Sequence, residues 1–257
     1  MNQENTPAIH VENLNIGYGD RTVLRNLNFT VNHGDIFIIM GPSGCGKSTL
    51  LKSIIGLNPP WAGKVFFGNE NFWEKEESER QMFMRKFGVL YQSGALWSSL
   101  TLEENVALPL QLYTNLPAAK IQSEVVLRLS LVGLEGYEDF YPSEISGGMR
   151  KRAGLARAIA LNPEVIFFDE PSAGLDPVSA QHLDELILQL RDAMGATLVI
   201  VTHELASIFA VGSNSIFLDA ETKTIIAGGR PQELLAASKD PKVIEFLTRG
   251  KKQGVSS

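Results

Sequence analysis

Residues 36–48 read IFIIMGPSGCGKS, and this stretch decides the fold. The apolar run at 36–40 is too short for a helix and is typical of a strand buried on both faces of a parallel sheet. The next eight residues match the pattern G-x-x-x-x-G-K-S, and residues 48–56 carry apolar side chains at helical spacing. A strand, a glycine-rich turn and a helix in this order predict a phosphate-binding loop, or P-loop.

The chemistry expected of this loop follows from its residue types. Its glycines allow successive N–H groups to converge on phosphate oxygens, and the helix that follows adds the partial positive charge of its N-terminus. Lys47 is expected to neutralise the β- and γ-phosphates of a nucleotide, and Ser48 to offer its hydroxyl to Mg²⁺. The alternative is a glycine-rich turn that binds nothing. The predicted nucleotide-binding residues of the loop are Gly41, Ser43, Gly44, Cys45, Gly46, Lys47, Ser48 and Thr49.

Two further apolar runs also end in polar residues. Residues 165–170 read VIFFDE, so a buried strand is expected to deliver two carboxylates at its C-terminal end, where ligands bind in open α/β sheets. Asp169 is predicted to hold Mg²⁺ and Glu170 to activate the attacking water; the alternative is an acidic helix cap. The run at 197–202 ends in His203, which we interpret as a group that reaches the γ-phosphate at the same sheet edge rather than as a structural histidine.

Strands and helices alternate along most of the chain, which indicates an α/β fold. The sequence predicts a P-loop NTPase core with a mainly parallel sheet, an N-terminal antiparallel β-subdomain over residues 9–31, and a helical subdomain inserted at about 100–160. We expect this ATPase domain to span residues 1–238. Residues 239–257 are expected to form a C-terminal tail with one short helix at 241–249.

The helical insertion carries clear start and stop signals. Thr101 followed by Glu104 predicts a capping box at the start of an apolar helix, which is expected to end near Pro109. Pro117 is expected at the first position of the next helix, and Ser146 at the start of a later one.

Composition narrows the class of protein. The 257 residues carry a net charge of −6, so a basic surface for nucleic acid is not indicated. No signal peptide is visible at the N-terminus, and no apolar run is long enough to span a bilayer, so a cytosolic location is expected unless the chain docks on a membrane partner. Cys45 is the single cysteine, which excludes an intrachain disulfide. Its place beside Lys47 and a helix N-terminus predicts a thiolate that a maleimide attacks, with inhibition of ATP hydrolysis; the alternative is a buried, unreactive thiol.

Residues 146–152 read SGGMRKR and predict a second anion-binding helix start, at Ser146 and Gly148. The plainer interpretation is an ordinary cap with a solvated basic face. The segment ISGGM at 145–149 resembles the signature loop, usually LSGGQ, of ABC-type ATPases.

Other landmarks of that family occur in the same order, and the resemblance extends over residues 8–230. It implies that Tyr18 stacks on adenine, that Gln92 contacts Mg²⁺ and water and links the site to a transmembrane partner, and that His203 is the switch histidine. It also implies that the loop ending at Asp176 faces a second subunit.

The resemblance further implies a head-to-tail dimer of two copies, in which the Ser146 end of one subunit covers the γ-phosphate held by Lys47 of the other. ATP and Mg²⁺ are the implied cofactors. Because one chain has two anion-binding helix ends but only one set of water- and metal-binding residues, this arrangement would complete two equivalent sites.

A narrower resemblance adds a branch of the family. Met149 in place of the usual glutamine, the basic run at 150–152 and the SGALW segment at 93–97 look like the ATPases of MCE-associated transporters, which include the Mla phospholipid systems. This likeness implies a phospholipid or another hydrophobic cargo, an integral membrane permease, an MCE-domain protein in the same complex, and a location on the cytoplasmic side of the inner membrane. The residues expected to dock on a cytoplasmic helix of the permease are Leu96, Trp97 and Leu100.

Three alternatives stay open at this stage. The chain can be the ATPase of another class of ABC importer or exporter. It can be a soluble ABC ATPase that acts on ribosomes or DNA, although its single P-loop and acidic charge disfavour this. It can also be a regulatory module that hydrolyses nothing, against which Glu170 and His203 both argue.

Overall fold

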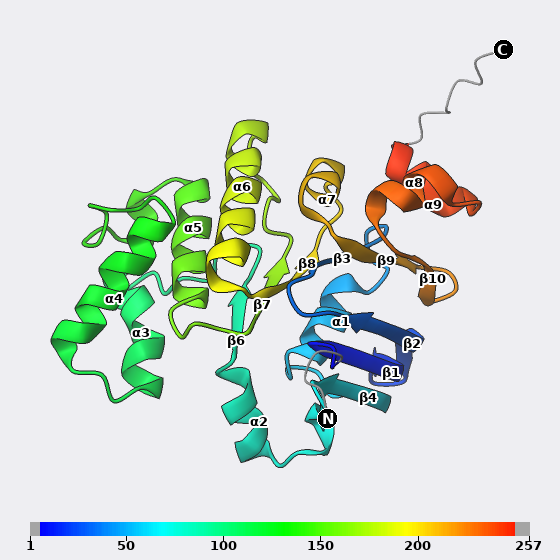
Figure 1. Cartoon of the computed structure of the whole chain (residues 1–257), viewed down its shortest axis with the longest axis horizontal. Helices are drawn as coiled ribbons and strands as arrows, with labels where there is room; N and C mark the ends of the chain where they lie inside the picture. The colour runs from blue at the N-terminus through cyan, green and yellow to red at the C-terminus, as the bar shows by residue number, and fades with distance from the viewer. Residues whose placement is uncertain (1–5, 250–257) are drawn as a thin grey trace. The chain divides into compact units, whose positions relative to one another are not determined.

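The computed structural model describes residues 6–249, and the chain in it forms two compact units. The first consists of Met1–Glu76 and Val199–Ser257, and the second of Glu77–Leu198 (Figure 1). Residues 1–5 and 250–257, which include the extreme N-terminus and the polar end of the expected tail, lie outside the described residues.

The first unit contains a four-stranded sheet with the strand order β2-β1-β4-β5. Its strands are β1 (Ile9–Tyr18), β2 (Arg21–Val31), β4 (Ala62–Phe67) and β5 (Glu70–Asn71), and the neighbouring strands are antiparallel. Alternate apolar residues of β1 and β2 are fully buried, as the period-two pattern of a sheet with one buried face requires. The expected N-terminal antiparallel β-subdomain is therefore confirmed.

The same unit holds the strand that leads into the P-loop. That strand, β3 (Ile36–Met40), is buried at every position and pairs in parallel with β9 (Asn214–Asp219), which in turn pairs antiparallel with β10 (Thr224–Gly228). Four helices belong to this unit: α1 (Lys47–Ile54), α7 (Leu205–Val211), α8 (Pro231–Ala237) and α9 (Pro241–Thr248). Of these elements, the sequence analysis above predicted β3, α1 and α9.

The second unit combines two parallel strands with most of the helices. Strand β6 (Phe87–Leu90) pairs with β7 (Val165–Asp169), with Leu90 opposite Phe168. Helices α3 (Leu102–Tyr113), α4 (Ala118–Leu131) and α5 (Gly147–Ala158) pack on one another and form the expected helical insertion. Two further helices are α2 (Glu77–Met84) and the long α6 (Pro177–Met194).

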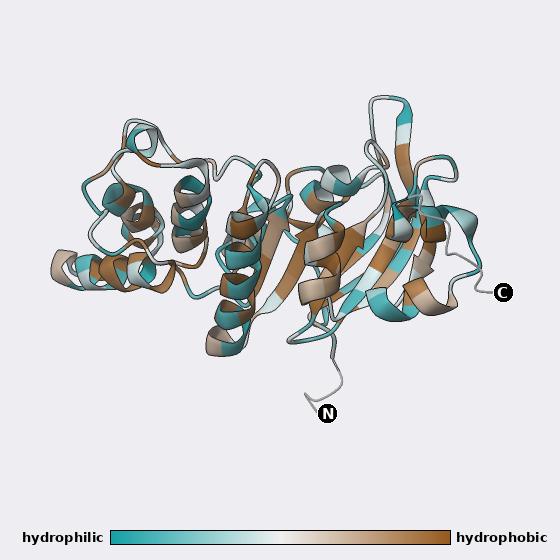
Figure 2. Cartoon of the chain, turned by 90° about the horizontal axis from the view of Figure 1, so that it is seen from above, coloured by the Kyte–Doolittle hydropathy of each residue, from teal (hydrophilic) through white to brown (hydrophobic). Residues whose placement is uncertain are grey.

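Six strands form one hydrogen-bonded sheet in the order β10-β9-β3-β8-β7-β6. Strand β8 (Thr197–Val201) contains the point at which the chain passes from the second unit to the first. The strands of this sheet are rich in hydrophobic residues (Figure 2), as expected for strands covered on both faces. The pairs β3–β9 and β6–β7 are parallel and the edge pair β9–β10 is antiparallel, which confirms the α/β class with a mainly parallel sheet.

Helix α3 begins as the sequence predicted but ends later than expected. Its capping box is present: the Glu104 N–H donates to Thr101 Oγ1, and the Thr101 N–H donates to the Glu104 carboxylate. The helix does not end near Pro109 but continues to Tyr113. Proline removes one hydrogen bond of the helix, but burial of Val106 and Leu110 on either side keeps the helix packed through this position. Pro117 precedes α4 as its N-cap residue instead of occupying its first turn.

An ion pair fastens α9 to the end of β9. The buried Asp219 carboxylate accepts from the N–H and hydroxyl of Thr222, both at 2.8 Å, and from Lys242 Nζ at 2.9 Å. The hydrogen bonds from Thr222 and Lys242 lower the pKa of Asp219 to about 2.

We predict that Asp219→Asn lowers the free energy of unfolding at pH 7. Because the folded-state pKa lies below the usual value, the stabilisation by the carboxylate is complete above about pH 4 and is lost as the pH falls toward 2. Urea denaturation of both proteins should show a gap that narrows between pH 4 and pH 2. Glu221→Gln, which removes the other, solvent-exposed carboxylate partner of Lys242, is the control and should change little. A gap that is independent of pH would contradict the assignment.

Candidate nucleotide-binding site

The P-loop of the first unit has a backbone that only glycine can follow at two points. Gly41 has φ 147°, and a Cβ there would lie 2.4 Å from the carbonyl oxygen of Leu218. Gly46 has φ 105° and precedes α1, and its Cβ would lie 2.9 Å from side-chain atoms of Val23 and Leu24. At both positions a side chain is disfavoured by the short distance to neighbouring atoms and also by the positive φ angle, so glycine is required.

The loop presents positive charge at its inner side. Lys47 is only 7% exposed, and its Nζ donates to the carbonyl oxygens of Gly41 (2.9 Å) and Pro42 (3.2 Å). Within the described residues, no side chain caps the N-terminus of α1, and no acidic side chain lies in its first turn. An anion bound at this helix end would therefore supply the acceptor that a capping side chain supplies elsewhere.

The structure overturns the expected reactivity of Cys45. The side chain is 1% exposed, and burial raises the pKa of its thiol, while the charge of Lys47 opposes this rise more weakly. The sequence pattern located the thiol beside a cation correctly, but it could not show that the side chain points into the protein. The structure therefore favours the alternative of a buried, unreactive thiol.

We predict that a maleimide labels Cys45 in the folded protein far more slowly than in urea, because the thiolate is both disfavoured and inaccessible. Mass spectrometry after timed quenching measures the two rates. ATP hydrolysis should be unaffected during the first minutes of native labelling. Rapid native labelling that MgATP prevents would show instead that the thiol faces the nucleotide.

Two predicted site residues occupy the first unit outside the loop. Tyr18 is the last residue of β1 and is 50% exposed, so its ring is available for stacking. His203 follows β8 and is also exposed, with its Nε2 3.8 Å from Glu204 Oε1. Glu204 was not singled out from the sequence, and a carboxylate adjacent to the histidine is the signal that could have identified it.

The second unit holds the acidic residues at the end of β7. Asp169 is the last residue of that strand, and Glu170 follows with φ 52°, a left-handed conformation that a non-glycine residue rarely adopts. Gln92 is exposed and follows β6, the parallel neighbour of β7. Gln92 and Asp169 therefore lie at the C-terminal ends of two adjacent parallel strands, a pairing that the sequence analysis did not predict.

The segment around Gln92 is fixed by residues that sequence reasoning missed. The Arg157 guanidinium donates to the carbonyl oxygens of Gly94 (3.2 Å) and Ala95 (2.9 Å) and thus holds the segment against α5. Tyr91, just before Gln92, is partly buried, and burial together with the charge of Asp169 raises the pKa of its hydroxyl.

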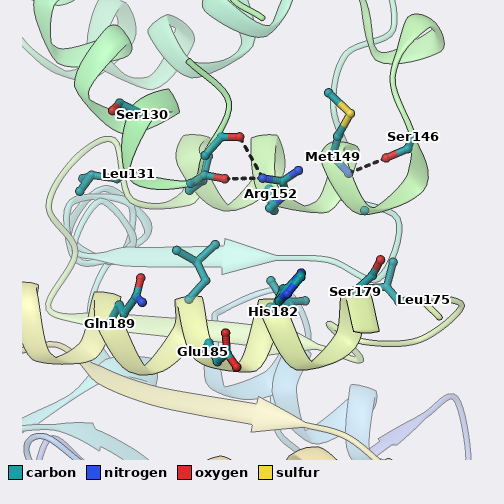
Figure 3. Close-up of a pocket in the computed structure, with 15 residues that line it drawn as sticks. Ser130, Leu131, Ser146, Met149, Arg152, Leu175, Ser179, His182, Glu185 and Gln189 are labelled. Atoms are coloured by element: carbon teal, nitrogen blue, oxygen red, sulfur yellow. Dashed lines mark hydrogen bonds between the residues drawn. The ribbon is translucent and has the colours of Figure 1, made fainter. Parts of the chain in front are cut away.

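Helix α5 starts as predicted at Ser146, whose Oγ accepts from the Met149 N–H at 3.2 Å. Ser146 and Gly148 line a pocket of about 540 Å³ whose walls are α5 and α6, with the end of α4 nearby (Figure 3). Asp176 caps α6 by accepting from the N–H groups of Val178 and Ser179, and the bonds from Ser179 lower its pKa. The side chain of Asp176 therefore has a structural role at the start of α6.

The basic run after the signature segment does not form a solvated face. Arg150 donates to the carbonyl oxygen of Ile145 (2.8 Å), and Lys151 donates to those of Pro171 and Ala173. Arg152 donates to those of Val132 and Gly133, each at 2.9 Å. Three consecutive cations thus connect α5 to three different segments of the second unit, which sequence periodicity alone could not reveal.

The donor set of the predicted Mg²⁺ site fits that ion. Mg²⁺ prefers oxygen ligands and usually takes only one or two carboxylates from the protein, with phosphates and water completing its shell. Ser48, Gln92 and Asp169 offer a hydroxyl, an amide oxygen and a carboxylate. Among residues 6–249 there is no group of three or more His, Cys, Asp or Glu side chains that could hold a metal ion.

Two features define a nucleotide-binding α/β ATPase. One is a P-loop that leads into a helix without a capping side chain, and the other is a buried strand that ends at Asp169 and is followed by Glu170. A family model described as ABC transporter matches residues 24–173. The chain therefore belongs to the ABC transporter family, and it is an ATP-binding ATPase of that family.

Relatives and solved structures agree with this assignment. The chain is 40% identical over 247 residues to the intermembrane phospholipid transport system ATP-binding protein MlaF of Escherichia coli K12, covering 96% of this chain and 91% of MlaF. It is also 40% identical over 240 residues to the probable ribonucleotide transport ATP-binding protein mkl of Mycobacterium tuberculosis H37Rv, covering 93% of this chain and 66% of mkl.

Among solved structures, cbiO1 of Clostridium perfringens, part of the ABC transporter complex cbiONQ, superposes with a TM-score of 0.82 at 26% identity and covers 95% of this chain and 96% of cbiO1. A dimeric ATP-binding cassette, MJ0796, in a post-hydrolysis state with ADP and Pi superposes with a TM-score of 0.78 at 29% identity. That match covers 86% of this chain and 98% of the cassette.

Proposed function

We propose that this chain is the ATP-hydrolysing subunit of a transporter that moves a phospholipid or another hydrophobic molecule through a membrane permease. The observation that carries the proposal is the 40% identity to MlaF over 96% of the chain, together with the Met149 variant of the signature segment. The equal identity to mkl, which is named for ribonucleotide transport, keeps a different cargo as the second candidate.

In this proposal each site residue has a chemical role. The backbone of the P-loop and the ammonium of Lys47 bind the β- and γ-phosphates of ATP, and Tyr18 stacks on the adenine. Ser48, Gln92 and Asp169 hold Mg²⁺, which neutralises charge on the phosphates.

The remaining groups act on the reacting water and phosphate. Glu170 orients and deprotonates the attacking water, and His203 and Gln92 hold the γ-phosphate and the water in line. The left-handed backbone of Glu170 supports this role, because such strained residues are concentrated at functional sites.

The working form in this proposal is a head-to-tail dimer. Its support is that helices begin at the P-loop and after Ser146, the two places where anion-binding helix ends were predicted, and that similar solved structures are dimeric cassettes. Ser146 and Gly148 of one copy then face the γ-phosphate held by Lys47 of the other, with Asp176 beside the same boundary.

A groove of the second unit fits a helix of the permease. It has a volume of about 380 Å³, and Trp97, which is 60% exposed, lies in it with the apolar side chains of Leu112 and Tyr113. The buried Asn105 fixes the Trp97 backbone by accepting from its N–H and donating to its carbonyl oxygen. Of the three docking residues predicted, only Trp97 lines this groove. The other lining residues are Gln81, Met84, Arg85, Phe87, Val89, Leu108, Pro109, Arg157, Ala158 and Leu161.

The groove supports docking of an amphipathic cytoplasmic helix through its apolar face. Within residues 6–249 no helix has the length and apolar character needed to cross a bilayer. From the likeness to MlaF, we propose that the permease holds the chain at the cytoplasmic face of the inner membrane, in a complex that also contains an MCE-domain protein.

We predict that Glu170→Gln lowers ATP hydrolysis by about 10²-fold or more, because the amide keeps the shape of the side chain but cannot accept the proton. ATP binding should be preserved, since the P-loop is unchanged. Phosphate release and binding of a fluorescent ATP analogue measure the two properties. Near-normal turnover would move the role of the base to another residue, with His203 as the next to test.

Shared sites predict complementation between two inactive variants. Lys47→Ala and Ser146→Arg are each expected to abolish hydrolysis in a homodimer. A mixed dimer has one site with both defects and one with neither. Random pairing should therefore restore at most about a quarter of the wild-type activity, from half heterodimers with half of their sites intact, and less to the extent that the two sites are coupled.

The measurement is best made in the complete transporter, because weak dimerisation of the isolated subunit would hide the turnover of a mixed dimer. A second readout is the number of ATP molecules retained by each heterodimer. One retained ATP supports sharing, whereas equal loss at both sites would contradict it.

The cargo is tested by purifying the chain with its permease and reconstituting the complex in vesicles. ATP-dependent movement of a fluorescent phospholipid, absent with Glu170→Gln, supports lipid transport. Movement of a labelled ribonucleoside instead of the lipid would favour the second candidate. Recovery of an active ATPase that binds no membrane protein would refute the transporter assignment.

A further inference from the structure

Lys151 is a buried cation that contacts the loop following Glu170. It lies on α5, five residues after Ser146, and is 6% exposed. Its Nζ donates to the carbonyl oxygen of Pro171 at 2.6 Å and to that of Ala173 at 2.5 Å. These two carbonyls belong to residues one and three positions after Glu170.

The loop after Glu170 obtains its hydrogen bonds from two sources. The Ala173 N–H closes a turn on the carbonyl oxygen of Glu170 (3.2 Å), and the Leu175 N–H closes the next turn on that of Ser172 (3.1 Å). The carbonyl oxygens of Pro171 and Ala173 are not the acceptors of these two turns, and they accept from Lys151 instead. The side chain therefore completes the hydrogen bonding of two consecutive turns that begin at a residue with left-handed backbone.

The cation occupies this place against an energetic cost. Burial lowers the pKa of Lys151, and the negative charge of Glu170 opposes that effect. An apolar side chain of the same length would fill the space without desolvation of a charge, but it would leave two carbonyls without this donor. The contacts therefore point to fixing of the loop rather than to filling of the core.

Helix α5 is itself held at other points by the neighbours of Lys151. Arg150 donates to the carbonyl oxygen of Ile145, the first residue of the signature segment, and Arg152 donates to those of Val132 and Gly133, just after α4. A displacement of α5 at Ser146 would therefore move the Lys151 ammonium, and with it the loop that carries Glu170.

We propose that Lys151 is a positioning residue that ties the helix beginning at Ser146 to the loop of Glu170 and thereby couples the two ATP sites of the dimer. This inference rests on the proposed function, in which Ser146 and Glu170 of one copy serve different nucleotides. When the N-terminus of α5 moves onto the ATP at one site, Lys151 would set the position of Glu170 at the other ATP site.

The test compares three variants in the complete transporter. Lys151→Met removes the donors and the charge, and Lys151→Arg retains both. Arg152→Met is the matched control, because it removes two carbonyl bonds from the next residue of the same helix without touching the Glu170 loop. Lys151→Gln, which keeps a donor without charge, replaces Lys151→Met if that variant does not fold.

We expect kcat of Lys151→Met to fall by about 10- to 100-fold with little change in the KM for ATP, because a displaced Glu170 harms the chemistry but not the P-loop. The Hill coefficient for ATP should fall toward one, and Lys151→Arg should restore most of both. Turnover and a Hill coefficient within twofold of wild type would overturn the proposal. An equal loss in Arg152→Met would assign the effect to α5 packing instead, and lower kcat with an unchanged Hill coefficient would overturn the coupling.

Hydrogen exchange provides a readout that does not depend on turnover. The amides of Ala173 and Leu175 should exchange faster in Lys151→Met than in wild type or Arg152→Met. Unchanged exchange would overturn the positioning role. The Ala173 and Leu175 amides could exchange faster in Lys151→Met while the mixed-dimer experiment above shows that the sites are not shared. That result would contradict the proposed dimer, but not the contact of Lys151 with the loop.

Discussion

The rest of the structure depends on one constraint: a phosphate-binding backbone must be presented at the end of a fully buried strand. Strand β3 is apolar and buried at every position, and Gly41 then turns the chain where a Cβ would collide with the Leu218 carbonyl. The turn leads directly into α1, whose N-terminus has a glycine in place of a capping side chain. Burial therefore determines where the strand lies, and the strand determines where the P-loop begins. The N-terminus of α1 at the end of the loop carries a partial positive charge that a bound anion would neutralise.

In the second unit, too, a buried strand leads directly to polar residues, which we propose act on the phosphate. Strand β7 is buried up to Phe168 and then delivers Asp169 and Glu170. What differs is the bracing: the loop after Glu170 depends on a cation from α5, and the segment after Gln92 depends on Arg157 of the same helix. Helix α5 therefore both begins with the signature segment and holds the segments that follow Gln92 and Glu170 in its own unit, so it is the element through which we infer communication.

Much of this could be predicted from the sequence because its signals are local. The apolar runs, the glycine spacing of the P-loop and the Thr101–Glu104 capping box all depend on residues close in the chain. The errors and omissions concern side-chain direction and tertiary contact. The inward orientation of Cys45, the continuation of α3 through Pro109, and the carbonyl partners of Lys151 depend on residues that are distant in the sequence. No periodicity of a single segment contains that information.

In the proposed working form, two copies of this chain enclose ATP between them. The mass and nucleotide content of Glu170→Gln in excess MgATP test this form, by light scattering combined with ATP titration. We expect ATP to convert the 28.2 kDa chain into a species of twice that mass that retains two ATP molecules, and Ser146→Arg in the same background to prevent this conversion. A monomer that binds one ATP with full affinity, unaffected by Ser146→Arg, would contradict it.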